Sequence, residues 1–183
     1  MKKQHHYAVR VVWTGNIGAG TGSYQGYERA HDIVAAGKPR LKGSSDPTFR
    51  GDPARWNPEE LLVASLSACH KLWYLGLCSQ ANVVVTSYED DAEGIMVEEA
   101  SGAGQFTRVT LRPRIIISAN SDKAVAHALH HRAHEMCFIA RSVNFPVYHE
   151  PTITSQPAAC ENTGYKRGHG LSGITGLKMG QSC

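Results

Sequence analysis

The longest apolar run of the chain, from Asn57 to Cys78, constrains the fold more than any other segment. Its length and spacing favour a helix over a strand. Asn57 can accept a hydrogen bond from a free backbone N–H as the N-cap, Pro58 suits the first helical position, and Glu60 stands at the capping-box position. Apolar side chains occupy most of the circumference, so we expect protein to cover this helix on nearly every side.

Composition and charge limit the class of protein. The 183 residues fit one domain, or one domain with a tail, and the net charge of +3 comes from 19 basic and 16 acidic residues spread along the chain. This distribution favours neither nucleic acid nor an anionic membrane as a partner. The N-terminal residues lack the apolar segment of a signal peptide, and no apolar run reaches the roughly 20 residues that span a bilayer, so we expect a cytoplasmic protein.

The segments on either side of the central helix predict an α+β fold. Before it, residues 7–13 and 23–35 have strand patterns, the glycine-rich residues 14–22 form a turn, and residues 38–56 form a long irregular segment. After it, residues 83–88, 94–97 and 106–117 predict an antiparallel meander, with Pro113 at an edge or a bulge. The glycine-rich turn lacks the following helix that a dinucleotide site requires.

A second helix is predicted from Ser121 and Asp122 to about Ser142, and a last strand over residues 147–154. The apolar stripe of this second helix has helical spacing and consists of Val125, Leu129, Ala133, Met136, Cys137 and Ala140. Residues 156–183 have no periodicity and predict a flexible tail after a domain of residues 1–155. Five cysteines at irregular spacing favour reduced thiols or a redox pair over a secreted disulfide framework.

Three motifs resemble the OsmC/Ohr family of thiol-dependent peroxidases, most closely its OsmC-like branch. They are the NPEEL motif of residues 57–61 with Ala68-Cys69, the SSDP and FRGD stretches of residues 44–52, and the HEMC and NFPV stretches of residues 134–147. The resemblance covers residues 7–154. It implies an intertwined homodimer with antiparallel sheets wrapped around two central helices, which reduces organic hydroperoxides in defence against oxidative stress.

The resemblance also implies the catalytic residues. A shielded Cys69 needs a nearby cation to react as a thiolate, and Arg50 and Arg55 are the candidates. The family pattern favours Arg50, with Glu59 orienting its guanidinium, and gives Cys137 the role of forming a disulfide with an oxidised Cys69. It further implies an external dithiol reductant, such as a dihydrolipoyl protein, and no cofactor.

The sequence leaves several alternatives open. Cys69 and Cys137 can simply pack in a core, as free cysteines often do, and Glu59 can serve only the helix N-terminus. On one straight helix Cys78 is too far from Cys69 for a disulfide, so packing is its expected role; Cys160 and Cys183 lie in the tail.

Glu59 precedes Cys69 by roughly 15 Å of straight helix, too far for one arginine to bind both groups. The helix can kink after Ser65 or Ser67, the Arg50–Glu59 pair can be separate from Cys69, or Glu59 can come from a second subunit. We favour the third arrangement, because a second copy would also cover the central helix.

Two other classes of function are compatible with the sequence. The second helix carries four histidines, His127, His130, His131 and His134. Their spacing allows zinc chelation, but no third ligand is assured, and a solvated polar face is the plainer interpretation. A non-catalytic small-ligand module is the other alternative. The apolar surroundings of Cys69 favour alkyl or fatty-acid hydroperoxides over hydrogen peroxide, while chain length and reductant are not fixed by the sequence.

Overall fold

The computed structural model describes residues 3–157, and its organising element is helix α1 (Pro58–Gln80). The predicted start is confirmed: Asn57 Oδ1 accepts from the Glu60 N–H at 2.7 Å, and Glu60 Oε2 accepts from the Asn57 N–H at 3.1 Å. These reciprocal bonds satisfy backbone donors that the first helical turn would otherwise leave unpaired. The helix then runs without interruption for 23 residues, which removes the predicted option of a kink near Ser65 or Ser67.

Within one chain, α1 is covered on one side only. Its fully buried residues are spaced four apart and are Leu66, His70, Tyr74 and Cys78. An exposed row with the same spacing consists of Ala64, Ala68, Leu72 and Gly76, of which Leu72 keeps 67% of its surface exposed. The expectation of nearly complete cover is therefore not met by a single chain.

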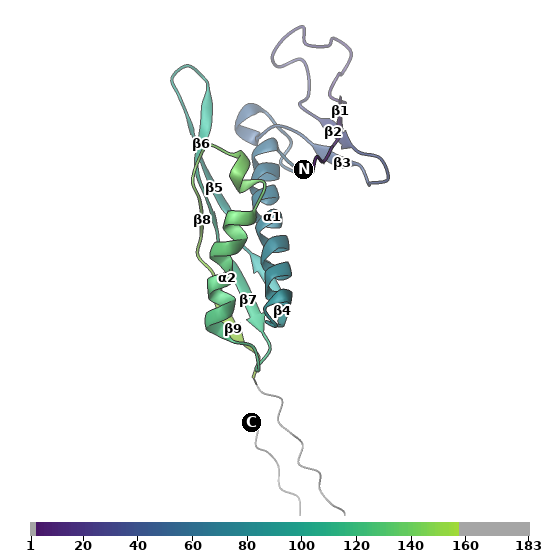
Figure 1. Ribbon diagram of the computed structural model, residues 1–183. Helices are drawn as coiled ribbons and strands as arrows, with labels where there is room; N and C mark the ends of the chain where they lie inside the picture. The colour runs from purple at the N-terminus through teal and green to yellow at the C-terminus, as the bar shows by residue number, and fades with distance from the viewer. Residues whose placement is uncertain (1–2, 158–183) are drawn as a thin grey trace, which may run out of the picture.

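Two three-stranded sheets, with strand orders β4-β7-β9 and β5-β6-β8, lie against the helices (Figure 1). Their strands are β4 (Val85–Asp90), β5 (Glu93–Glu98), β6 (Gly104–Leu111), β7 (Pro113–Ile117), β8 (Val147–His149) and β9 (Thr152–Ser155). β5 pairs with β6 and β4 with β7 in antiparallel fashion, whereas β8 and β9 join by parallel pairing to β6 and β7. The sheet is not the simple meander that the sequence predicted, because the last segment returns beside the central strands.

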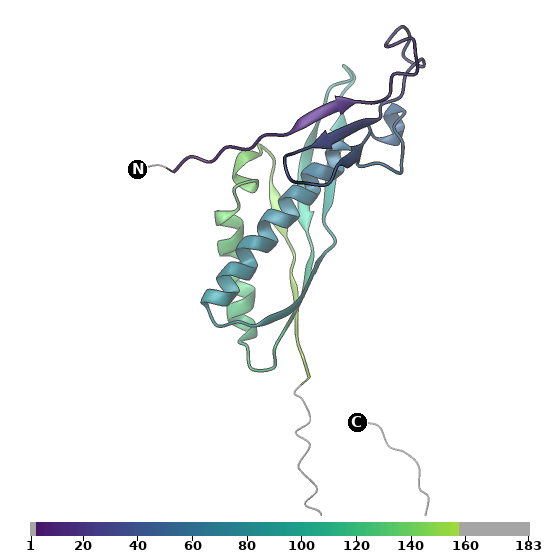
Figure 2. The same cartoon turned by 90° about the vertical axis from the view of Figure 1, so that its right-hand side faces the viewer.

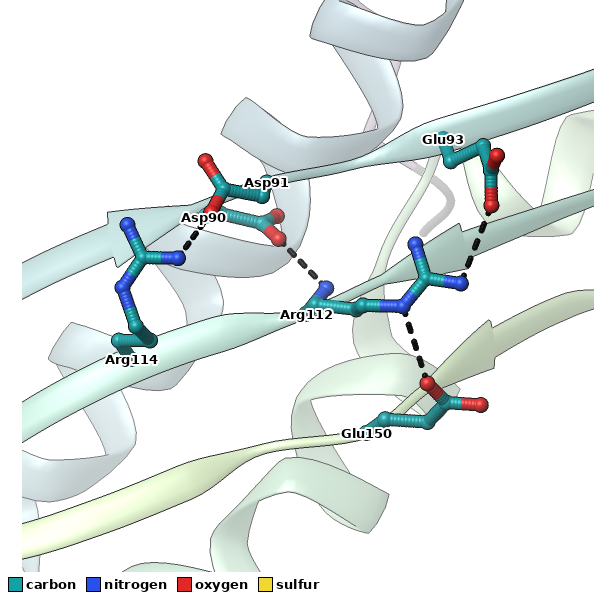
Figure 3. Close-up of polar contacts among 6 residues, drawn as sticks. All are labelled: Asp90, Asp91, Glu93, Arg112, Arg114 and Glu150. Carbon is teal, nitrogen blue, oxygen red and sulfur yellow. Dashed lines mark hydrogen bonds and ion pairs between the residues drawn. The ribbon is translucent and has the colours of Figure 1, made fainter.

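A polar network marks the junction of the two sheets (Figure 3). Asp90 at the end of β4 accepts from the backbone N–H of Arg112 at 2.7 Å. The Arg112 guanidinium binds Glu93 and Glu150, each at 3.1 Å, and so connects β5 with the segment after β8. Pro113 begins the central strand β7 at this break, so the prediction of an edge or bulge position is wrong. Because proline is the first residue of the strand, its missing N–H removes little of the hydrogen bonding between strands.

A third sheet, in the order β1-β2-β3, stands at the N-terminal end of α1, away from α2 (Figures 1 and 2). It consists of β1 (Arg10–Trp13), β2 (His31–Val34) and β3 (Leu41–Gly43), all antiparallel. The predicted strand over residues 23–35 begins only at His31, because residues 14–30 form a loop closed by a bond from the Thr14 N–H to the Ala30 carbonyl at 2.9 Å. The irregular segment 38–56 contains β3 and the short 3₁₀ helix η1 (Pro47–Phe49).

Helix α2 (Lys123–Met136) is shorter than predicted. Asp122 caps its start by accepting from the Ala124 and Val125 N–H groups, whereas Cys137 is extended and ends the helix before the 3₁₀ helix η2 (Ala140–Ser142). The two helices lie side by side on one face of the sheets (Figures 1 and 2).

The expectation that no apolar run is long enough to span a bilayer is wrong for α1, which could cross a membrane by length and composition alone. Its packing on α2 and the sheets fits the core helix of a soluble domain. Apart from its first two residues, the predicted tail of residues 156–183, with Cys160 and Cys183, lies outside the described residues.

Candidate active site

Cys69 and Cys137 meet where α2 ends against the middle of α1. Cys69 is partly exposed, Cys137 is 1% exposed, and both are free thiols. Burial, together with a hydrogen bond to Cys69, raises the pKa of Cys137 to about 11. Cys137 Sγ also accepts from the Ala140 N–H at 3.4 Å, which fixes the sulfur beside η2. The arrangement pairs an accessible thiol with a buried, protonated one, which suits a pair that alternates between dithiol and disulfide.

Cys78 belongs to a different part of the molecule. It is 1% exposed and packs in the hydrophobic core with Tyr74 and Ala126. Burial raises its pKa, so this thiol stays protonated and unreactive at neutral pH. Because α1 is unbroken, Cys78 lies roughly 13 Å along the axis from Cys69, beyond the reach of a disulfide.

The structure places the two candidate arginines in the segment before α1. Arg50 is exposed, follows η1 with a left-handed φ of 66°, and makes no ion pair with any described residue. Arg55 lies 3.4 Å from Asp52 and 4.0 Å from Asp32, so nearby carboxylates already neutralise it. Both arginines line a cavity of about 470 Å³ that does not include Cys69.

Glu59 lies in the first turn of α1 and lines a larger cavity of about 720 Å³ between α1 and strands β4 and β5. Its Oε2 atom is buried and has no hydrogen-bond partner among the described residues. A buried carboxylate oxygen without a hydrogen-bond donor is costly in free energy, so a donor from outside these residues would stabilise it. Within one chain the structure thus brings Cys69 and Cys137 together, but it shows neither Arg50 nor Glu59 in contact with them.

Asp90 is a polar residue of this region that sequence reasoning missed. Its Oδ2 accepts from the Ser67 hydroxyl at 2.5 Å, while Oδ1 accepts from the Arg112 N–H. One carboxylate therefore fixes α1, two residues before Cys69, to the junction of the sheets. The only signal in the sequence was a serine within an apolar helix.

The prediction that the α2 histidines form a solvated face is wrong for His130. This side chain is 1% exposed and forms a hydrogen bond with the equally buried His70 of α1, with His130 Nδ1 and His70 Nε2 3.0 Å apart. His131 fits the prediction, since it is exposed and pairs with Glu135 at 3.4 Å. The described residues contain no group of three or more side chains arranged to hold a metal ion.

The chain is thus a small α+β protein with two helices on its sheets and two free thiols in contact where the helices meet. Residues 51–151 match the OsmC-like protein family, and the chain belongs to this family. The match supports a redox or peroxidase role at the level of the family.

Among solved structures, an OsmC-like protein of unknown function from Vibrio cholerae is similar, with 33% identity and a TM-score of 0.74 over 81% of this chain and all of that one. The organic hydroperoxide resistance protein OhrB of Bacillus subtilis shares the fold, with 20% identity and a TM-score of 0.52 over 80% of this chain and 98% of that one. The uncharacterised protein YmaD of Bacillus subtilis is 23% identical over 144 residues, which are 76% of this chain and 87% of that protein.

Proposed function

We propose that this chain is a thiol-dependent peroxidase that reduces organic hydroperoxides to alcohols with Cys69 and Cys137. The contact between the accessible Cys69 thiol and the buried Cys137 thiol is the observation that carries the proposal. Family membership supports a redox role, and the shared fold of proteins described as organic hydroperoxide resistance proteins supports the substrate class.

In the first step, the Cys69 thiolate attacks the distal oxygen of the hydroperoxide. An S–O bond forms, the O–O bond breaks, and the departing alkoxide takes a proton to become an alcohol. In the second step, the Cys137 sulfur attacks the Cys69 sulfenic acid, the S–S bond forms, and the hydroxyl group leaves as water with the proton of Cys137. An external dithiol, such as a dihydrolipoyl group, then reduces the disulfide and restores both thiols.

Arg50 and Glu59 complete the site in a homodimer. Arg50 is the better candidate to stabilise the thiolate, because the carboxylates of Asp32 and Asp52 already engage Arg55. The buried, unpaired Oε2 of Glu59 is suited to accept a guanidinium N–H. A second copy packed on the exposed row of α1 would cover Leu72 and bring Glu59 of one chain to Cys69 of the other.

The apolar residues of α1 favour alkyl or fatty-acid hydroperoxides as substrates. Residues 1–155 form the catalytic domain in this proposal, residues 156–183 a separate tail, and the protein acts in the cytoplasm.

Steady-state peroxidase assays test the function. With a dithiol reductant, tert-butyl and cumene hydroperoxides should be turned over faster than hydrogen peroxide, and Cys69→Ser should abolish turnover. Cys78→Ser is the matched control, because it removes a buried thiol from the same helix and should leave turnover unchanged. Absent turnover with all three peroxides, or an equal loss in both variants, contradicts the proposal.

A further inference from the structure

Four histidine rings lie together between α1, α2 and β8. His70 and His130 are fully buried and share one hydrogen bond, and their rings are nearly coplanar at an angle of 10°. The His149 ring lies 5.6 Å from that of His70 and 5.6 Å from that of His134, measured between centroids. Tyr74 stacks on His130 with centroids 3.9 Å apart. Of the four histidines, only His134 belongs to one of the family motifs.

The His70–His130 pair is an unusual choice for a core position. The outer nitrogens, His70 Nδ1 and His130 Nε2, are buried without a hydrogen-bond partner among the described residues. Buried polar atoms left unpaired cost free energy, so two apolar side chains would be easier to accommodate if packing were the only requirement. A buried polar pair does, however, favour one alignment of two helices over neighbouring ones, because every shifted alignment leaves its bonding atoms unpaired.

The same two helices carry the thiol pair. Cys69 immediately precedes His70 on α1, and Cys137 follows His130 by seven positions, directly after the end of α2. A slide of α2 along α1 by one turn would be about 5.4 Å. A disulfide requires Cα atoms within about 7 Å, so such a slide would separate the two sulfurs.

We propose that the His70–His130 hydrogen bond positions Cys137 against Cys69 by fixing the alignment of α2 on α1, so that disulfide formation depends on this bond. His70 and His130 are positioning residues that act through the helices. The inference rests on the proposed function for the assignment of Cys69 and Cys137 as the reacting pair.

The surroundings keep the pair neutral, as the bond requires. Burial, and then the charges of neighbouring histidines, lowers the pKa of His70 to about 4 and that of His130 to about 3. The titratable groups that face the pair are His127, His134 and Tyr74 on the helices, His149 on β8, and Tyr88 on β4 beyond Tyr74. Among the described residues, no carboxylate is hydrogen-bonded to either ring. At neutral pH one ring therefore donates its single N–H to the other.

The test measures the equilibrium between the Cys69–Cys137 disulfide and a glutathione redox buffer, because this reaction needs no hydroperoxide. His130→Leu removes one partner of the bond and should lower the effective concentration of the two thiols about tenfold. The double variant His70→Gln/His130→Asn places amide groups where Nε2 and Nδ1 now bond, and it should retain the wild-type value within about threefold. His131→Gln, on the exposed face of α2, is the matched control and should change nothing.

Far-UV circular dichroism establishes that each variant is folded. A folded His130→Leu protein with a wild-type effective concentration overturns the inference. If His130→Leu does not fold, the double variant decides: retention of the wild-type value supports the positioning role, and a tenfold fall or loss of folding contradicts it.

The two proposals fail separately. A protein without peroxidase turnover, but with a disulfide equilibrium that responds to His130→Leu, would contradict the proposed function alone. An active peroxidase whose disulfide equilibrium is unchanged by His130→Leu would contradict the positioning role alone.

Discussion

Subunits carrying Cys69→Ser and subunits carrying Glu59→Ala should complement one another when they are co-expressed. The reason is the geometry of α1, which is continuous from Pro58 to Gln80. At a rise of 1.5 Å per residue, Glu59 and Cys69 lie roughly 15 Å apart along the axis. Hydrogen bonds from one guanidinium reach about 3 Å, so one arginine cannot serve both groups of the same chain. If the glutamate comes from the second subunit, this distance within one chain no longer limits the site.

The expected recovery of activity follows from how the two substitutions are distributed between the two sites of a mixed dimer. In a mixed dimer, one site contains both substitutions, and the other combines an intact Cys69 with an intact Glu59. Each mixed dimer should therefore have about half of wild-type activity. Random assembly makes about half of the dimers mixed, so an unfractionated preparation should reach about one quarter of wild-type activity.

The assay is cumene hydroperoxide reduction by dimers that are purified through two different affinity tags. Cys69→Ser co-expressed with Cys137→Ser is the control, because both cysteines of a site come from one chain and no intact site can form. Mixed dimers without activity would refute the shared site, and an active monomer in light scattering would refute it more directly.

Three further predictions concern stability. The pKa values of His70 and His130 lie below the ordinary value of about 6.5, so the folded state binds fewer protons than the unfolded state. The two histidines therefore contribute to the free energy of unfolding above pH 6.5, and this contribution should be lost as the pH drops towards 4. Urea unfolding at pH 7 and pH 5 should differ by about 2 kcal/mol per histidine, and His70→Gln/His130→Asn should flatten this dependence. Asn57→Ala should cost about 1 kcal/mol by removing the cap of α1, whereas Asn57→Ser should be nearly neutral in the same unfolding assay. Gly94→Ala places a Cβ atom 2.6 Å from one neighbouring side chain and 2.7 Å from another, and should lower the free energy of unfolding by about 1 to 3 kcal/mol in the same assay.

Helix α1 was predictable because its signals are local. The cap at Asn57, the proline at the first helical position and the acidic first turn all stand within four residues, and the structure shows the bonds that they imply. The resemblance predicted the OsmC-like fold in the same way, from short motifs around this helix.

The end of α2 was not predictable from such signals. Cys137 leaves the helix with φ −69° and ψ 109°, although no glycine or proline stands beside it. The contact with Cys69, in a distant part of the chain, accompanies this extended conformation. Tertiary packing therefore determines where α2 ends, whereas local propensity predicted that the helix continues to about Ser142.

The His70–His130 pair was missed for a related reason. A histidine on a helix with other histidines resembles a polar face, and its partner lies 60 residues earlier in the chain. Only the packing of α2 on α1 brings the two rings together. The parallel pairing of β8 and β9 with the central strands depends on distant contacts in the same way.

The most direct test of the account is peptide mass analysis after one equivalent of cumene hydroperoxide and blocking of the remaining thiols. We predict that the protein loses two hydrogen atoms and yields a disulfide-linked peptide pair containing Cys69 and Cys137, while Cys78 remains a thiol. Cys137→Ser should instead trap an oxidised Cys69 that proceeds to sulfinic acid with excess peroxide. A disulfide between Cys69 and Cys78, or an unoxidised Cys69, would contradict the account.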